Sequence, residues 1–206
     1  MNEEQARDAV RAIVGDSAMP ALDRFADLIR RESEQQNLVA RATLNALWQR
    51  HFLDSAQLLP LANDQPGTWL DVGTGAGFPG MVVALVTERP VILVEPRRLR
   101  ADLLRQVAEQ EGIAARVTVQ QAKVERVTGA TASVISARAV ASLSDLLQST
   151  AHLADMNTLY LLPKGQSATT EMNEARRRFA GLFHVERSIT DPASGIVVAH
   201  NVKERR

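Results

Sequence analysis

The sequence predicts an α/β domain built on a seven-stranded, mostly parallel sheet that ends in an antiparallel hairpin and follows a helical extension. Apolar residues recur at helical spacing up to about residue 66 and in short β-branched runs after it. Those runs alternate with amphipathic stretches, a pattern typical of successive βα units around a parallel sheet. The last two runs are joined by a short, turn-rich loop at 191–195, which favours an antiparallel hairpin over a crossover.

Residues 1–65 are predicted to form the helical extension, packed on the main domain. Pro20 opens one amphipathic segment. Its apolar face carries Leu22, Phe25, Leu28 and Ile29. A second helical face follows Thr43 and carries Leu44, Leu47, Trp48, His51, Phe52, Ser55 and Leu59.

The main domain is expected to cover residues 66–206. Its predicted strands lie at 68–72, 91–94, 116–119, 132–136, 157–162, 183–189 and 195–201. Its predicted helices lie at 80–87, 97–111, 142–152 and 168–180.

The amino-acid composition excludes several kinds of protein and several kinds of chemistry. The 206 residues are 45% hydrophobic and 23% charged, which excludes a disordered or fibrous chain. Cysteine is absent, which excludes disulfides, thiolate metal sites and cysteine nucleophiles. Lys plus Arg and Asp plus Glu each total 24, so a nucleic-acid partner would have to meet local basic clusters. An acidic start and the absence of any apolar run near about 18 residues predict no signal peptide and no membrane span, hence a cytoplasmic location.

The first strand of the main domain runs into a glycine-rich loop at 73–80, followed by a helix. Glycines there let a ligand approach the backbone, and the helix offers free N–H groups to an anionic end of the ligand. The loop formally matches the dinucleotide pattern G-x-G-x-x-G. However, Gly73, Gly75 and Gly77 follow the strand directly, and Asp71 stands two residues before them, an arrangement similar to the first motif of S-adenosylmethionine methyltransferases.

Acidic residues follow the next two strands. The carboxylate of Glu95, at the end of the second strand, can accept two hydrogen bonds from a ribose diol, whichever nucleoside cofactor binds. Alternatively, Glu95 pairs with Arg97 or Arg98 at the surface. Val124 and Glu125 follow the third strand, where adenine is usually held at a sheet edge.

Arg138 follows the fourth strand and is expected over the cleft at the carboxyl end of the sheet. A structural salt bridge is the alternative role for this arginine. The motifs of amino-directed base methyltransferases, Asn or Asp with Pro-Pro and an aromatic residue, are missing here, and cytosine-carbon enzymes need a cysteine. The four histidines show no metal-ligand spacing, so no metal site is expected.

Basic residues form local clusters, each of which is more often a solvated face than an RNA contact. The clusters are Arg30–Arg31, Arg97–Arg98 with Arg100, Arg176–Arg178, and the tail with Lys203, Arg205 and Arg206.

From Asn37-Leu38 to Lys164-Gly165 the chain resembles the RsmG (GidB) family of bacterial small-subunit rRNA guanine-N7 methyltransferases. The most specific block is residues 71–80, with its Phe-Pro-Gly ending. Further blocks resembling the family are residues 50–55 and 137–141 and the pair Lys164-Gly165. The chain departs from the family at Val39, where members usually have Thr, and around Leu99-Arg100 and Leu103-Leu104.

The resemblance implies a Rossmann-like class I fold and methyl transfer from S-adenosylmethionine to N7 of a guanine in 16S rRNA. It implies cofactor contacts at Gly73, Phe78, Val124, Glu125 and Arg138. The expected partner is 16S rRNA within the 30S subunit or its assembly intermediate, and the expected state is a monomer. Guanine N7 carries an exposed lone pair, so attack on the methyl group needs no general base.

The remaining site residues are assigned by their place at the carboxyl ends of predicted strands. Arg138 and Lys164 are expected to hold the target nucleotide or shape the cofactor pocket, and Asp71 and Glu95 to orient the loop and the ribose. The alternatives are a small-molecule or protein methyltransferase, an NAD-dependent oxidoreductase or nucleotide-binding regulator, and a non-catalytic assembly factor.

Overall fold

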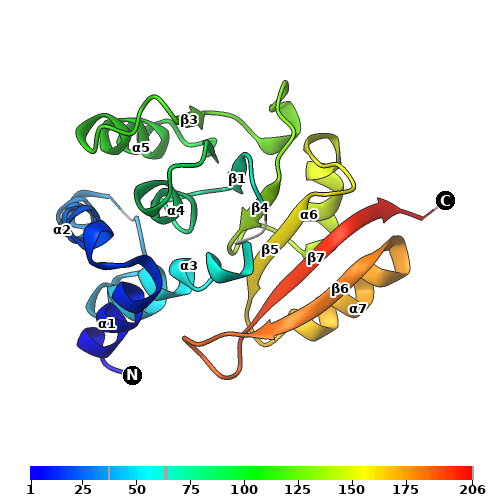
Figure 1. Ribbon diagram of the computed structural model, residues 1–206, viewed down its shortest axis with the longest axis horizontal. Coiled ribbons are helices and arrows are strands. Elements are labelled where there is room, and N and C mark those ends of the chain that lie inside the picture. Colours follow the sequence, from blue (N-terminus) through cyan, green and yellow to red (C-terminus); the bar gives the residue numbers. More distant parts are fainter. Residues whose placement is uncertain (37, 63–64, 206) are drawn as a thin grey trace.

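The computed structural model describes residues 1–36, 38–62 and 65–205, so Asn37 and Arg206, named above, lie outside the described residues. Its strands are β1 (Trp69–Val72), β2 (Val91–Val94), β3 (Val117–Gln120), β4 (Val134–Ala137), β5 (Leu159–Lys164), β6 (Phe179–Arg187) and β7 (Gly195–Glu204). They form one sheet in the order β3-β2-β1-β4-β5-β7-β6 (Figure 1).

The sheet is parallel from β3 to β5 and antiparallel at its end. β1 pairs in parallel with β2 and β4, and β2 with β3 and β4 with β5 also pair in parallel. β7 is antiparallel to both β5 and β6. The predicted mostly parallel sheet with its terminal hairpin is therefore confirmed. β6 begins at Phe179, four residues earlier than predicted, because it pairs with the full length of β7 as far as Glu204.

Four helices connect the strands of the main domain, close to their predicted positions. They are α4 (Gly80–Val86), α5 (Arg98–Gln110), α6 (Leu143–Thr150) and α7 (Ala168–Arg178). The edge of the sheet at which β1, β2, β4 and β5 end is called the carboxyl edge below, and the opposite edge the amino edge. Because β7 runs against β5, the β6–β7 loop lies at the carboxyl edge, where Gly195 pairs with Lys164.

The sequence before β1 is helical, but less regularly than predicted. Its α-helices are α1 (Glu3–Val14), α2 (Met19–Gln35) and α3 (Asp54–Ala56). The sequence analysis did not single out α1, although Asn2 and Gln5 form a capping box at its start. Instead of one long α-helix after Thr43, the chain forms a 3₁₀ helix at Arg41–Ala46 and a π-helix at Trp48–Leu53.

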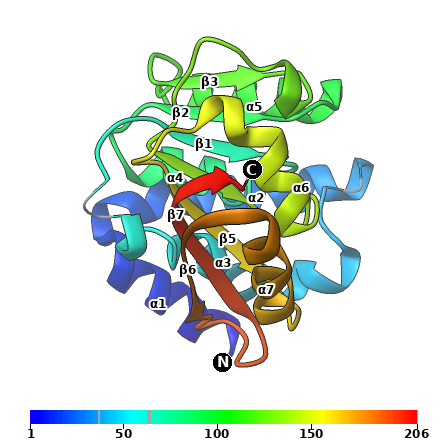
Figure 2. The same ribbon diagram turned by 90° about the vertical axis from the view of Figure 1, so that its right-hand side faces the viewer.

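Alternate residues of the strands face two separate hydrophobic cores, as the two-residue period of a strand requires. In β1, Trp69 packs with the core that holds α1, α2, α4 and α5. Its neighbour Leu70 packs with the core that holds α6 and α7. Figure 2 shows the sheet from its β6 side, with α7 packed beside the hairpin. No described helix is long and apolar enough to cross a membrane.

An aromatic cluster joins the N-terminal helices to the glycine-rich loop. Phe78 of that loop packs against Phe25 of α2 with ring centroids 5.5 Å apart. It also packs edge-on against Phe52, at 5.3 Å. Phe52 in turn lies 4.5 Å from the Trp48 ring. The helical segment thus shares a core with the loop, which fixes the loop from the side opposite β2.

Candidate active site

Asp71 anchors the glycine-rich loop by hydrogen bonding. This side chain is completely buried, and its Oδ2 accepts a hydrogen bond from the N–H of Gly80 at 2.9 Å. Ser136 of β4 donates to Oδ1 at 2.7 Å. Burial raises the pKa of Asp71 to about 6, although these hydrogen bonds oppose the rise. A Cβ at position 80 would lie 2.6 Å from that of Asp71, so only glycine fits at the start of α4.

Glu95 fastens the same loop from the β2 side. It is 3% exposed, and its Oε2 accepts the N–H of Gly75 at 2.9 Å. Its Oε1 accepts the N–H of Arg97, also at 2.9 Å. The alternative of a surface ion pair with Arg97 or Arg98 is not what the structure shows, since Glu95 is buried and its contact with Arg97 is to the backbone N–H. Each carboxylate oxygen can accept a second hydrogen bond, so Glu95 can hold the loop and accept from a ribose hydroxyl together.

The three glycines of the loop all have positive φ, at 66° for Gly73, 62° for Gly75 and 107° for Gly77. A side chain at Gly77 would meet Phe25 and one at Gly73 would meet Val140. At Gly75 the nearest neighbour of a Cβ lies 3.5 Å away, so the backbone conformation itself selects glycine there.

Phe78 and the Val124–Glu125 pair differ in what they can offer a cofactor. Phe78 is only 4% exposed as a residue, and its N–H donates to the carbonyl oxygen of Thr74, so it supports the loop from within and offers a cofactor little surface. Val124 opens a 3₁₀ turn just after β3, with its side chain buried and that of Glu125 exposed. Both segments lie at the carboxyl edge, as the sequence predicted.

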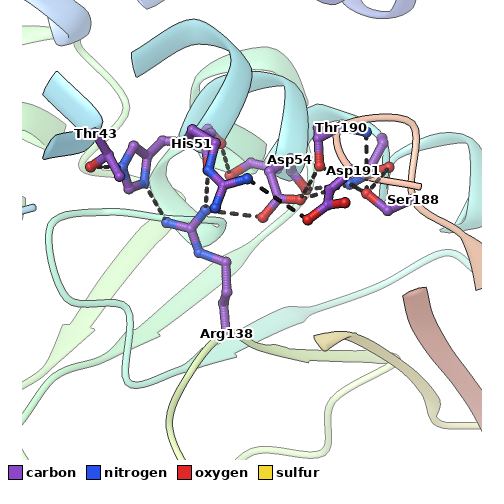
Figure 3. Close-up of polar contacts among 10 residues, drawn as sticks. Thr43, His51, Asp54, Arg138, Ser188, Thr190 and Asp191 are labelled. Atoms are coloured by element: carbon purple, nitrogen blue, oxygen red, sulfur yellow. Dashed lines mark hydrogen bonds and ion pairs between the residues drawn. The ribbon is translucent and has the colours of Figure 1, made fainter. Parts of the chain in front are cut away.

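Arg138, which directly follows β4, is held by the N-terminal helical segment (Figure 3). Its Nη1 donates to the carbonyl oxygen of Arg50 at 2.9 Å and to Oδ2 of Asp54 at 3.1 Å. Its Nη2 donates to Nδ1 of His51 at 2.8 Å. The guanidinium also lies over the Phe78 ring, 5.5 Å from the centroid. The salt bridge that was the alternative role for Arg138 exists, and its partner is Asp54.

His51 is neutral in this arrangement. Arginine has no acceptor atom, so Nδ1 must accept from Arg138, and the ring proton is on Nε2. That Nε2 lies 2.9 Å from Oγ1 of Thr43, whose own hydroxyl donates to the carbonyl oxygen of Ala40. Burial lowers the pKa of His51 to about 3, with further lowering by Arg138 and Arg50.

Asp54 connects Arg138 to the β6–β7 loop. Its Oδ1 accepts from Thr190 Oγ1 at 3.0 Å and from Gln57 Nε2 at 2.9 Å. Thr190 lies 2.8 Å from the hydroxyl of Ser188, and Gln57 Oε1 accepts the N–H of Ile189 at 2.9 Å. The labelled side chains in Figure 3 show this row running from Thr43 to Ser188 above Arg138.

Lys164, the last residue of β5, is also engaged. Its Nζ donates to the carbonyl oxygen of Ala141 at 2.7 Å and lies 2.9 Å from Oε2 of Glu171. Burial by itself would raise the pKa of Glu171. Hydrogen bonds from Lys164, Ser167 and the N–H of Leu143 outweigh that effect and hold the pKa below its usual range.

A cavity of about 490 Å³ opens at the carboxyl edge between these groups. It brings together Arg138 and Lys164, which the sequence placed at the ends of two neighbouring strands. Its other lining residues are Thr43, Arg50, His51, Asp54, Ala139, Ala141, Pro163, Gly165, Glu171, Ser188, Thr190, Asp191, Ser194, Gly195 and Ile196. The β4–α6 connection lies between this cavity and the glycine loop, since Ala139 lines the cavity and Val140 touches Gly73.

Of the cavity residues, only Arg138 and Lys164 were predicted to have functional roles. His51 and Asp54 stand in the family-like block at 50–55, so that block was the available signal for them. Glu171 and Thr190 carried no local signal. Among the described residues, no group of three or more His, Cys, Asp or Glu is placed to hold a metal ion.

Comparison with solved structures identifies the fold. A methyltransferase from Geobacter sulfurreducens aligns with a TM-score of 0.59 at 15% identity, covering 88% of each chain. A SAM-dependent O-methyltransferase from Thermotoga maritima aligns with a TM-score of 0.55 at 15% identity, covering 74% of this chain and 66% of that one. At this identity the likeness concerns the fold alone, and it confirms the predicted class I methyltransferase fold.

Sequence comparison identifies the family. The chain matches the family model of GidB, rRNA small subunit methyltransferase G, over residues 18–194. Ribosomal RNA small subunit methyltransferase G of Rhizorhabdus wittichii is 44% identical over 207 residues, covering 100% of this chain and 95% of the relative. The protein of that name from Novosphingobium aromaticivorans is 45% identical over 188 residues, covering 90% of this chain and 81% of the relative. The resemblance stated from the motifs is confirmed, and the chain belongs to the rRNA small subunit methyltransferase G family.

Proposed function

We propose that this protein transfers the methyl group of S-adenosylmethionine to N7 of a guanine in 16S rRNA. The observation that carries the proposal is the cavity at the ends of β4 and β5, separated from the glycine loop only by the β4–α6 connection. Open α/β sheets bind their ligands at this edge. A family whose relatives are named for methylating small-subunit rRNA supplies the acceptor class.

The residues at the carboxyl edge suit the cofactor. Glu95 presents a buried carboxylate beside the backbone of Gly75, where a ribose diol can be bound. Val124 and Glu125 border the expected adenine position after β3. Arg138 lines the cavity and also lies over the Phe78 ring of the glycine loop, so it connects the two. When bound, S-adenosylmethionine supplies a methyl group on a cationic sulfur.

The chemistry of the acceptor fits a site without a free base. Guanine N7 has an exposed lone pair and loses no proton when it is methylated. In the cavity, both ring nitrogens of His51 have partners, and the carboxylates of Asp54 and Glu171 accept from cations and hydroxyls. These side chains therefore act by positioning, which can itself supply several kcal/mol of a barrier, about 7–11 in well-oriented systems.

The methylated base carries a positive charge, because N7 has used its lone pair. Three carboxylates lie around the cavity, those of Asp54, Glu171 and Asp191. They offset the charges of the three cations that line the same cavity, Arg50, Arg138 and Lys164, so a base that becomes cationic meets no net positive charge. We propose Arg138 and Lys164 as the residues that hold the acceptor nucleotide or shape the adjoining cofactor pocket.

The partner is proposed to be 16S rRNA within the 30S subunit or its assembly intermediate, met by a monomer in the cytoplasm. The formal net charge of +0 gives no general attraction to RNA. Local groups of exposed cations are available instead. Those at the carboxyl edge are Arg50, Arg97, Arg98, Lys123, Arg126 and Arg187.

The test is incubation with labelled S-adenosylmethionine and 30S subunits that lack the modification. Chain scission at 7-methylguanosine then maps the product. One labelled guanine in 16S rRNA is the expected result, with protein-free rRNA methylated more slowly. Label on ribosomal protein, or none on the RNA while S-adenosylhomocysteine still binds, would contradict the proposed acceptor and favour a protein or small-molecule methyltransferase.

A further inference from the structure

We propose that Asp54 is a positioning residue, which sets the Arg138 guanidinium for its ligand and ties it to the β6–β7 loop. This inference rests on the proposed function for its main assay. From the sequence alone, Asp54 had no predicted role and was only part of the family-like block at 50–55. Its place in the fold gives it one, because it contacts Arg138 on one side of the cavity and Thr190 on the other.

Asp54 joins three segments that are distant in the sequence. It is the first residue of α3, it is 84 positions from Arg138, and it is 136 positions from Thr190. Its two carboxylate oxygens accept hydrogen bonds from different partners. Oδ2 accepts from Arg138 at 3.1 Å, and Oδ1 accepts from Thr190 and Gln57 at 3.0 and 2.9 Å. A single carboxylate therefore orients the arginine and the loop together.

The protein contacts of Arg138 use only some N–H groups of its guanidinium, and the others can donate to a ligand. An arginine carries five N–H groups. Within the described parts of the chain, three N–H contacts are seen, to Asp54, His51 and the carbonyl oxygen of Arg50. The two remaining N–H groups can donate to a ligand. All three protein acceptors come from residues 50–54, so this short segment sets the guanidinium plane.

Asp54 is the only charged member of that set of acceptors, since His51 is neutral and Arg50 contributes a peptide oxygen. The ion pair is mostly shielded from water, with side-chain exposures of 20% for Arg138 and 17% for Asp54. A charge-assisted hydrogen bond in such surroundings is stronger and more directional than a neutral one. Loss of the Asp54 charge should therefore loosen Arg138 more than loss of either neutral acceptor.

The first variant is Asp54→Asn, which keeps the size of the side chain and removes its charge. We expect kcat/KM on 30S subunits to fall at least tenfold while the protein stays folded at the assay temperature. The matched control is Asp23→Asn, which breaks a two-bond pair between the carboxylate of Asp23 and Arg7 outside the cavity. The control should lower the melting temperature comparably and leave kcat/KM within twofold of wild type.

A double-mutant cycle separates positioning from general support of the fold. If Asp54 acts through Arg138, adding Asp54→Asn to Arg138→Gln should change kcat/KM less than twofold beyond Arg138→Gln alone. Multiplicative losses in the double variant would overturn the proposal, because Asp54 would then act independently of the arginine. Unchanged activity in Asp54→Asn, or a loss that merely parallels the melting temperature as in Asp23→Asn, would overturn it too.

The same cycle is measured with the dissociation constant of S-adenosylhomocysteine by titration calorimetry, which requires no acceptor. If wild type does not methylate 30S subunits, the proposed acceptor fails, and this second readout decides the role of Asp54 alone. Non-additive losses of affinity would support positioning through Arg138. Additive losses, or no loss in Arg138→Gln by either readout, would refute it.

Discussion

The two edges of the sheet use arginine in different ways. At the amino edge, arginines donate to peptide oxygens at strand and helix ends. Arg89 bonds to the carbonyls of Gly67 and Gln65, and Arg116 to that of Ala84. Arg176 bonds to the carbonyl of Phe183, and Arg205 to those of Arg176 and Phe179. At the carboxyl edge, Arg138 also donates to one peptide oxygen, that of Arg50, but it pairs in addition with a mostly buried carboxylate and a histidine beside a cavity.

This difference between the two edges indicates which basic clusters are placed to bind a ligand. The Arg176–Arg178 cluster and the tail lie where α7 ends and where β6 meets the end of β7. There Arg178 pairs with Glu204, and Arg176 and Arg205 satisfy backbone oxygens that would otherwise face solvent unpaired. The Arg97–Arg98 cluster lies at the carboxyl edge, next to the residue that holds the glycine loop. Position relative to the sheet, not the number of arginines, separates the two.

The largest expected effect is that of removing Arg138. In Arg138→Ala we expect methylation of 30S subunits to fall at least about 100-fold, as for loss of a positioned charged group in an active site. Asp54 would also lose its ionic partner, which costs about 2 kcal/mol of unfolding free energy. The matched variant is Arg89→Ala at the amino edge, which should lose similar stability but keep kcat. Turnover and denaturant unfolding of both variants check this, and equal turnover in the two would remove the functional distinction between the edges.

The next effect concerns the glycine loop. Gly75 has a φ of 62° and donates its N–H to Glu95. A β-branched residue there costs about 1–2 kcal/mol of backbone strain, so Gly75→Val should weaken S-adenosylhomocysteine binding about tenfold or more. The fold should remain intact, because a Cβ at this position meets no neighbour closer than 3.5 Å. Gly112→Val is the control, since Gly112 also has positive φ but lies at the end of α5. Unchanged affinity in Gly75→Val would place the cofactor elsewhere.

The next expected effect is a dependence of the unfolding free energy on pH, caused by His51 at the carboxyl edge. The pKa of His51 is lowered to about 3, so the unfolded chain binds more protons than the folded one below the ordinary pKa near 6.5. The contribution of His51 to stability is thus full above pH 6.5 and is lost as the pH falls toward 3. At pH 5.5 the loss relative to pH 7.5 should be about 1 kcal/mol.

The variant His51→Gln isolates this contribution. Asp71 acts in the opposite direction, because its raised pKa makes folding more favourable as the pH falls through 6. Asp71 is present in both proteins. The difference between their profiles of unfolding free energy against pH therefore measures the contribution of His51. Urea unfolding of wild type and variant from pH 7.5 to 5.0 measures it. Parallel profiles would show that His51 has the same pKa in the folded and unfolded chain, which would contradict the buried, neutral imidazole described above.

The fold and the positions of the glycine loop, Glu95 and Arg138 in it were predictable because their signals are local. A glycine loop after a strand, an acid at the next strand end and an arginine after β4 each occupy a few consecutive residues. The cavity was not predictable in the same way. Asp54 meets Arg138 and Thr190 only after segments 84 and 136 positions away have packed against it, and Glu171 reaches Lys164 only once α7 has folded back on β5. The π-helix at Trp48–Leu53 was not predicted either, because its apolar residues keep an approximately α-helical period.

The smallest expected effect tests which edge meets RNA. Arg97→Ala with Arg98→Ala removes two exposed cations at the carboxyl edge, and Arg177→Ala with Lys203→Ala removes two at the amino edge. Each phosphate contact contributes about 0.7–0.9 to the slope of log affinity against log salt. If RNA lies across the carboxyl edge, the first pair should lower that slope by about 1–2 and weaken binding to 30S subunits a few-fold, and the second pair should leave both unchanged. Filter binding over a range of salt concentrations measures the slope. A reversed result would mean that RNA reaches the cavity from around α7, and the arginines of the amino edge would then serve both the backbone and the substrate.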